Sequence, residues 1–188
     1  MRLTLCLYAA LALAPMTLPA RAAAPEPVVT VESRAADGTR FYKDSLVIRA
    51  PAKVLWSGLT DPVQYRRWAA PVSRVDFRLG GEIEASYDPK GHLGDPDNIR
   101  NAIIAYLPER LLVFRNVQAP AALPARELYP STVKIVEFEP LGPDLTRVSI
   151  SGVGFGDGPK FDQLYRFFVS GDGEQLKAMR AAYETPAH

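Results

Sequence analysis

The sequence predicts an α+β fold in which a curved antiparallel β-sheet wraps around one long C-terminal helix. Three observations support this fold. Residues 159–184 have the apolar spacing of a long helix, most of the chain before them is strand-like, and two short helical segments follow the first strands. The 188 residues are 47% hydrophobic, which suits a single domain with a substantial core.

Apolar side chains recur in the C-terminal segment at steps of three or four residues, which places them on one face of a helix. They are Phe161, Leu164, Tyr165, Phe168, Leu176, Met179 and Tyr183. Gly171-Asp172-Gly173 falls in the one gap of this pattern. Because each glycine costs about 1 kcal/mol relative to alanine inside a helix, we expect a kink or a break there.

Strand-like segments cover residues 28–32, 41–49, 75–79, 82–87, 99–106, 111–116, 132–139 and 145–151. Gly80-Gly81 is typical of a two-residue hairpin turn. Before this turn, one side of the strand carries Val75, Phe77 and Leu79. After it, Ile83, Ala85 and Tyr87 alternate with Glu82, Glu84 and Ser86. This alternation predicts a sheet with one dry face and one solvent-facing side, where Glu84 would lie.

Two short helices are expected between the early strands and the later ones. Ala50-Pro51 is expected to begin the first, with the proline in its first turn. Asp61 is predicted to cap the second helix, and Pro62 occupies its first position. Pro71 ends this helical region.

Four stretches are predicted to lack regular structure. Residues 88–98 consist of turn-forming residues, and residues 117–130 carry three prolines. A turn is expected at residues 140–144. The glycine-rich residues 152–158 are expected to form a flexible lead-in to the C-terminal helix, whose movement would gate a pocket.

Composition argues against a nucleic-acid binder. The 22 basic and 21 acidic residues give a formal charge of +1, without the basic surplus that phosphate binding requires.

The N-terminus has the pattern of a secretory signal peptide. Arg2 precedes an apolar run at residues 3–14, and Ala20-Arg21-Ala22 offers a cleavage site. We expect residues 1–22 to be this signal, 23–40 a leader with an extra strand, and 41–184 the single folded domain. Cleavage would remove Cys6, the only cysteine, which excludes disulfides and thiol chemistry from the mature chain. The predicted location is the periplasm or the extracellular medium, with no transmembrane span after cleavage and an uncleaved anchor as the alternative.

Several motifs resemble the SRPBCC superfamily of START-like, helix-grip domains. The resemblance covers residues 44–184 and is greatest to the branch related to the activator of the ninety-kilodalton heat-shock chaperone's ATPase, in its exported bacterial members. It rests on the run from Ala50-Pro51 through Leu55-Trp56 to Asp61-Pro62 and Trp68, and on Phe77-Arg78-Leu79-Gly80-Gly81, Gly94-Asp95-Pro96 with Asn98 and Asn101, and Gly154-Phe155-Gly156-Asp157-Gly158-Pro159 with Tyr165 and Phe168.

The resemblance implies a hydrophobic or aromatic small molecule, or a lipid, held in a cavity between the C-terminal helix and the sheet. Two alternatives stay open: a cyclase-, dehydratase- or hydrolase-type enzyme that uses the same cavity, and a protein-interaction domain of the envelope. The superfamily has no common catalytic motif, so no catalytic residue and no cofactor are expected. Chaperone activation needs a cytosolic partner, which conflicts with export. We expect a monomer or a weak dimer.

Aromatic side chains and one arginine are the candidates for the cavity wall. They are Trp68, Tyr87, Arg100, Tyr106, Phe114, Tyr129, Phe155, Tyr165 and Phe168. Arg100, Asn101, Arg115 and Asn116 either bind a ligand's polar group or lie on the solvent-facing side. A one-residue slip in strand register would exchange these alternatives.

The loop at residues 88–98 is a further candidate site. His92 is the only histidine before the last residue, and its two interpretations are an acid–base role and a solvated loop position. Asp88, Asp95, Asp97 and Asn98 suggest calcium, but their spacing does not follow the EF-hand loop. Turn formation explains these residues equally well, and we expect no metal site.

Overall fold

The computed structural model describes residues 26–184, so the predicted signal peptide lies outside the described residues. One eight-stranded sheet has the order β1-β2-β8-β7-β6-β5-β4-β3, and all its neighbours are antiparallel. Its strands are β1 Val29–Arg34, β2 Arg40–Ile48, β3 Val72–Val75, β4 Glu82–Ser86, β5 Ile99–Leu107, β6 Leu111–Gln118, β7 Val133–Gly142 and β8 Leu145–Phe155.

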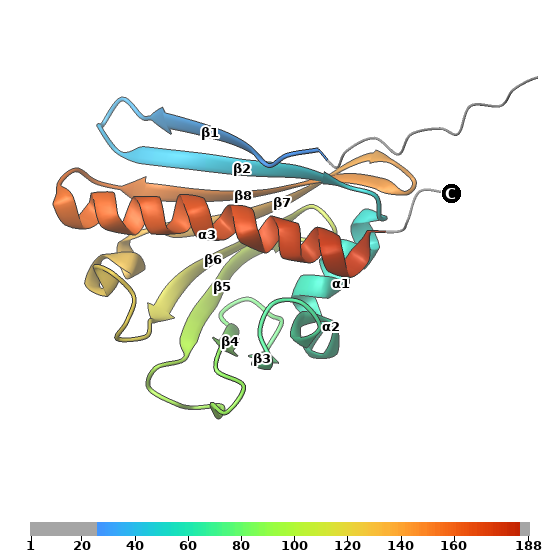
Figure 1. Ribbon diagram of the computed structural model, residues 1–188, viewed down its shortest axis with the longest axis horizontal. Helices are drawn as coiled ribbons and strands as arrows, with labels where there is room; N and C mark the ends of the chain where they lie inside the picture. Colours follow the sequence, from blue (N-terminus) through green and yellow to red (C-terminus); the bar gives the residue numbers. More distant parts are fainter. Residues whose placement is uncertain (1–25, 185–188) are drawn as a thin grey trace, which may run out of the picture.

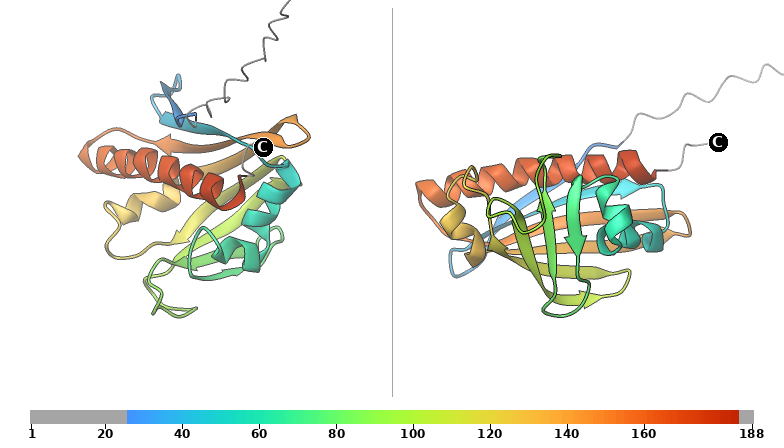
Figure 2. Two further views of the ribbon diagram at one scale, coloured as in Figure 1. Left: turned by 45° about the vertical axis from the view of Figure 1, so that its right-hand side comes forward. Right: turned by 90° about the horizontal axis from the view of Figure 1, so that it is seen from below.

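The helices are α1 Ala52–Thr60, α2 Pro62–Arg66, the 3₁₀ helix η1 Arg126–Ser131 and α3 Pro159–Tyr183. Three of them, α1, α2 and α3, confirm the predicted arrangement, whereas the short helix η1 was not expected. Figure 1 shows α3 lying across the sheet, and Figure 2 shows the sheet curving around it from β1 and β2 toward β3 and β4. None of the helices between residues 26 and 184 is long and apolar enough to cross a membrane.

The predicted cap of α2 is confirmed. The Oδ1 atom of Asp61 accepts hydrogen bonds from the backbone N–H groups of Val63 at 2.8 Å and Gln64 at 2.9 Å, and Pro62 occupies the first turn. Pro51 precedes α1 as its N-cap rather than lying within the first turn.

Two apolar clusters pack between α3 and the sheet. The larger one, near α1, includes Leu55, Ile103, Leu112 and Leu176. The smaller one, near the start of α3, includes Tyr42, Phe155, Leu164, Tyr165 and Phe168. The buried face of α3 contributes to both, as its apolar periodicity predicts.

The expected kink or break in α3 is not found: α3 is one continuous helix from Pro159 to Tyr183, and Figure 1 shows no sharp bend in it. Between the two glycines, Asp172 is 3% exposed and its carboxylate accepts hydrogen bonds from Lys134 and Tyr42. These buried contacts hold the helix against the sheet, and tertiary contacts of this kind override a weak local propensity.

The prediction of a two-residue hairpin turn at Gly80-Gly81 is also wrong. β3 ends at Val75 and β4 begins at Glu82, so residues 76–81 connect them, and Leu79 is 62% exposed. The backbone of this connection also bonds to β5: the N–H of Gly80 donates to the carbonyl of Ile103, whose N–H donates to the carbonyl of Gly81. Pairing with β5 therefore determines the path of the two glycines.

Several strand ends differ from the prediction. β6 extends to Gln118 and η1 forms at Arg126–Ser131, both within the region expected to be irregular. β7 and β8 are longer than predicted, so only Pro143 and Asp144 separate them. β8 extends to Phe155, so Gly152 and Gly154 lie within a strand and not in a flexible lead-in.

Glu84 is buried rather than solvent-facing, at 1% exposure. The loop at residues 88–98 covers it: its carboxylate accepts hydrogen bonds from the N–H of Gly94 at 2.5 Å and Nδ2 of Asn98 at 2.8 Å, and Arg74 lies at 3.1 Å. Burial alone would raise the pKa of Glu84, but these donors outweigh it and hold the pKa below its usual value.

We therefore expect Glu84→Gln to lower the free energy of unfolding by about 2 kcal/mol at neutral pH, because it removes charge-assisted hydrogen bonds. A lowered folded-state pKa stabilises the protein above the unfolded-state pKa, and this stabilisation is lost as the pH falls through the folded value. The difference between wild type and variant should thus shrink in acid. Urea titrations at several pH values measure it, and a difference that stays constant down to pH values below the usual glutamate range would contradict this assignment.

Candidate functional site

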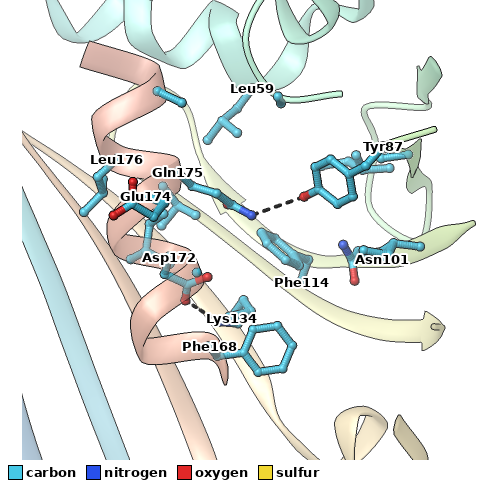
Figure 3. Close-up of a pocket in the computed structure, with 18 of the residues that line it drawn as sticks. Leu59, Tyr87, Asn101, Phe114, Lys134, Phe168, Asp172, Glu174, Gln175 and Leu176 are labelled. Carbon is cyan, nitrogen blue, oxygen red and sulfur yellow. Dashed lines mark hydrogen bonds and ion pairs between the residues drawn. The ribbon is translucent and has the colours of Figure 1, made fainter. Parts of the chain in front are cut away.

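A cavity of about 580 Å³ lies between α3 and the concave face of the sheet (Figure 3). Most of its wall is apolar, with side chains from α1, the central strands and α3: Leu59, Ile83, Ala85, Phe114, Val136, Val148, Ile150, Leu176 and Met179. Gly171 also faces it, and a Cβ atom added to Gly171 would meet nothing within 4 Å. This space falls within the usual size of a small-molecule site, about 300–1,000 Å³.

A buried ion-pair cluster of Lys134, Asp172 and Tyr42 lies at the cavity wall. The Nζ atom of Lys134 donates to Oδ2 of Asp172 and to the hydroxyl of Tyr42, and this hydroxyl donates to the same Oδ2. The side chains of Lys134 and Asp172 are 4% and 5% exposed, and both line the cavity. The Nζ atom also lies 3.9 Å from the centroid of the Phe168 ring.

Burial dominates the electrostatics of this cluster. It lowers the pKa of the Lys134 ammonium, although the neighbouring Asp172 carboxylate opposes this shift. Burial and the Asp172 charge both raise the pKa of Tyr42, so its hydroxyl stays neutral and remains a donor. Removing either charge would leave the other unpaired in a nearly dry environment.

Asp44 is a buried residue of β2 and does not line the cavity. Its Oδ1 atom accepts a hydrogen bond from Oγ1 of Thr30 at 2.5 Å, and its Oδ2 atom has no partner among residues 26–184. Burial raises the pKa of Asp44.

Sequence reasoning missed Lys134 and Asp172, although the signal was present. Lys134 alternates in phase with Val136 and Phe138 along β7, so it shares their buried side. Asp172 lies four residues after Phe168 and four before Leu176, on the apolar face of α3. Because a break was expected at the glycines, Asp172 was not counted as part of that face.

Five of the nine predicted candidates line the cavity: Trp68, Tyr87, Phe114, Tyr129 and Phe168. The other four lie elsewhere. Phe155 and Tyr165 pack around the Tyr42 ring in the smaller apolar cluster, and Tyr106 packs on Phe77. Arg100 lies away from the cavity, where its Nη2 atom is 2.6 Å from the Glu82 carboxylate.

The other strand candidates divide in the same way. Asn101 lines the cavity. Asn116 is buried and its amide donates to the backbone carbonyls of Arg100 and Gln118, whereas Arg115 is exposed. At the cavity rim, Nε2 of Gln175 donates to the hydroxyl of Tyr87 at 3.3 Å, which connects α3 to the end of β4 (Figure 3).

The aspartates of the loop at residues 88–98 form hydrogen bonds with backbone N–H groups. The carboxylates of Asp88, Asp95 and Asp97 accept hydrogen bonds from the backbone N–H groups of Lys90, His92 and Ala121, respectively. The side chain of His92 is 85% exposed. In the described part of the chain, no three His, Cys, Asp or Glu side chains gather as a metal site would require.

A curved antiparallel sheet that holds a C-terminal helix over an apolar cavity defines the helix-grip class of the SRPBCC superfamily. The family model for "Activator of Hsp90 ATPase homolog 1-like protein" matches residues 49–184, and the chain belongs to this family. No curated protein matches the chain.

Solved structures share this fold at low sequence identity. The Aha1 dimer from Colwellia psychrerythraea is 13% identical with a TM-score of 0.60, and covers 76% of this chain and 94% of its own. CalU16 from Micromonospora echinospora is 18% identical with a TM-score of 0.57, and the match covers 85% of this chain and 86% of CalU16. A conserved protein of unknown function, EF2215 from Enterococcus faecalis, is 15% identical with a TM-score of 0.59, and the match covers 85% of this chain and 79% of EF2215. These likenesses concern the fold alone.

Proposed function

We propose that this protein binds a hydrophobic or aromatic small molecule in the cavity between α3 and the sheet. The observation that carries the proposal is the cavity itself, about 580 Å³ of space bounded mainly by apolar side chains. Apolar walls with a few placed polar groups are the usual design of small-molecule sites. Lys134, Asp172 and Asn101 supply such groups here.

Blocking the cavity tests this function. Gly171→Phe should abolish binding of a neutral polarity-sensitive dye such as Nile red, because the new ring would occupy the open space beside Gly171. The same change at Ala181, an exposed α3 residue outside the cavity wall, is the matched control and should leave binding unchanged. Fluorescence titration measures both, and equal affinities in the two variants would refute the assigned site.

Native mass spectrometry adds a test of the natural ligand. Protein purified without detergent should carry a stoichiometric small-molecule adduct that denaturation releases. The Gly171→Phe variant should lack the adduct and the Ala181→Phe variant should retain it.

A second candidate is an enzyme that uses the same cavity. The observation in its favour is that Lys134 and Asp172, two groups capable of acid–base chemistry, meet within hydrogen-bond reach at the wall. Incubation of the released ligand with fresh protein separates the candidates, because a binding protein returns the molecule unchanged and an enzyme converts it.

We further propose that the protein acts after export, on the basis of the N-terminal sequence pattern. Fractionation of bacteria expressing the full chain, followed by N-terminal sequencing, should give a periplasmic protein that begins at Ala23 or Pro25. A cytosolic protein with an intact N-terminus would refute this.

A further inference from the structure

We propose that the ligand is an uncharged molecule whose hydroxyl group, such as a phenol, donates a hydrogen bond to Oδ1 of Asp172. This inference rests on the proposed function and specifies the ligand class of the same cavity. It follows from the charges at the wall and from a carboxylate oxygen of Asp172 that accepts no hydrogen bond from residues 26–184.

Within residues 26–184, the cavity wall offers no free cation to an anionic ligand. Its charged side chains are Lys134, Asp172 and Glu174. Glu174 is 70% exposed at the rim and pairs with Lys177 at 2.8 Å. Lys134 is the only cation of the wall within residues 26–184, and the protein already occupies its three N–H directions: Asp172, the Tyr42 hydroxyl and the face of the Phe168 ring.

Asp172, by contrast, has unused hydrogen-bonding capacity. Its Oδ2 atom accepts the bonds from Lys134 and Tyr42. No group in the described residues donates to Oδ1, although a carboxylate has about four lone-pair sites. Figure 3 shows this second oxygen directed away from Lys134 toward the space beside Phe114. A ligand that brings a donor to this position would satisfy a nearly buried acceptor.

The group that donates a hydrogen bond to Asp172 is expected to belong to an uncharged ligand. The positive charge of Lys134 already compensates Asp172, so an ammonium ligand would gain less here than beside a lone carboxylate. It would also lose its hydration in an otherwise apolar cavity, which costs several kcal/mol per ion. A hydroxyl makes the same hydrogen bond at a much lower desolvation cost.

Three matched probes test this inference: 2-naphthol, its methyl ether 2-methoxynaphthalene, and 2-naphthoate, together with the same set built on phenanthrene. At neutral pH the alcohols are uncharged donors, the ethers have no donor and the acids are anions. A hydrogen bond to a charged group is worth a preference of roughly tenfold or more. We expect each alcohol to bind at least tenfold more tightly than its ether, and the acids to bind weakest.

The double variant Lys134→Met/Asp172→Leu removes both charges, so the ratio of alcohol to ether affinity should fall to nearly one. If this variant does not fold, the ranking in the wild type still decides. Equal affinities of alcohol and ether, tightest binding of the acid, or an unchanged ratio in a folded double variant would each overturn the inference. In those cases, probe binding that Gly171→Phe blocks would still support the proposed function. Failure of the neutral probes to bind, or their undiminished binding to Gly171→Phe, would refute the proposed function itself.

Discussion

Replacing Asp172 by leucine is expected to lower the free energy of unfolding by about 3–5 kcal/mol, the usual cost of removing one partner of a buried ion pair. The cost arises because the Lys134 ammonium would remain in a position where its side chain is only 4% exposed. It would keep only the neutral Tyr42 hydroxyl as an acceptor. Urea unfolding measures the loss.

The double variant Lys134→Met/Asp172→Leu serves as the control for this prediction. Apolar replacement of both members of a buried pair is often neutral or stabilising, so most of the lost stability should return. If the double variant is as unstable as Asp172→Leu alone, loss of packing rather than an unpaired charge causes the effect.

Gly152→Ala is expected to destabilise the protein by about 3 kcal/mol, at the upper end of the usual range for overpacking. A Cβ atom at this position of β8 would lie 2.5 Å from Cε1 of the Tyr42 ring. The ring cannot move aside easily, because it packs against Phe155 and Tyr165 and its hydroxyl is bonded to Lys134 and Asp172.

Gly142→Ala is the matched control for this overlap. Gly142 is also a strand residue, at the end of β7, but its added Cβ would meet only Cβ of Leu145 at an ordinary 3.9 Å. Thermal unfolding should show a clear loss for Gly152→Ala and little change for Gly142→Ala. Similar losses in the two variants would mean that contact with Tyr42 is not the cause.

The features of the fold that depend on local sequence could be predicted. The apolar spacing of residues 161–183 identifies the buried face of α3, and Asp61-Pro62 marks the start of α2. The alternation of Ile83 and Ala85 identifies the side of β4 that faces the cavity. Each of these signals depends on a few neighbouring residues, so the sequence displays it directly.

The errors arise where distant segments meet. Glu84 alternates like a solvent-facing residue, and only the loop bearing Gly94 and Asn98 buries it. The Gly80-Gly81 pair is typical of a tight hairpin, but hydrogen bonds to Ile103 of β5 set its conformation. The spacing of neighbouring residues shows neither the loop that buries Glu84 nor the β5 residue that bonds to the two glycines.

The site was predicted in part for the same reason. Aromatic residues such as Phe114 and Phe168 were placed in the cavity wall because large apolar side chains tend toward a core. Lys134 and Asp172 were missed because charged residues are rarely buried unless paired, and their pairing joins β7 to α3 across 38 positions of the sequence.

The central claim is that the cavity between α3 and the sheet binds a small apolar molecule, and an NMR titration of ¹⁵N-labelled protein with 2-naphthol tests it most directly. The account predicts saturable one-to-one shifts of backbone amides around the cavity, including those of Ile83, Phe114, Gly171 and Leu176. These shifts should be absent in Gly171→Phe. The absence of saturable shifts in the wild type, or shifts confined to surfaces away from the cavity such as the exposed strand β1, would contradict the account.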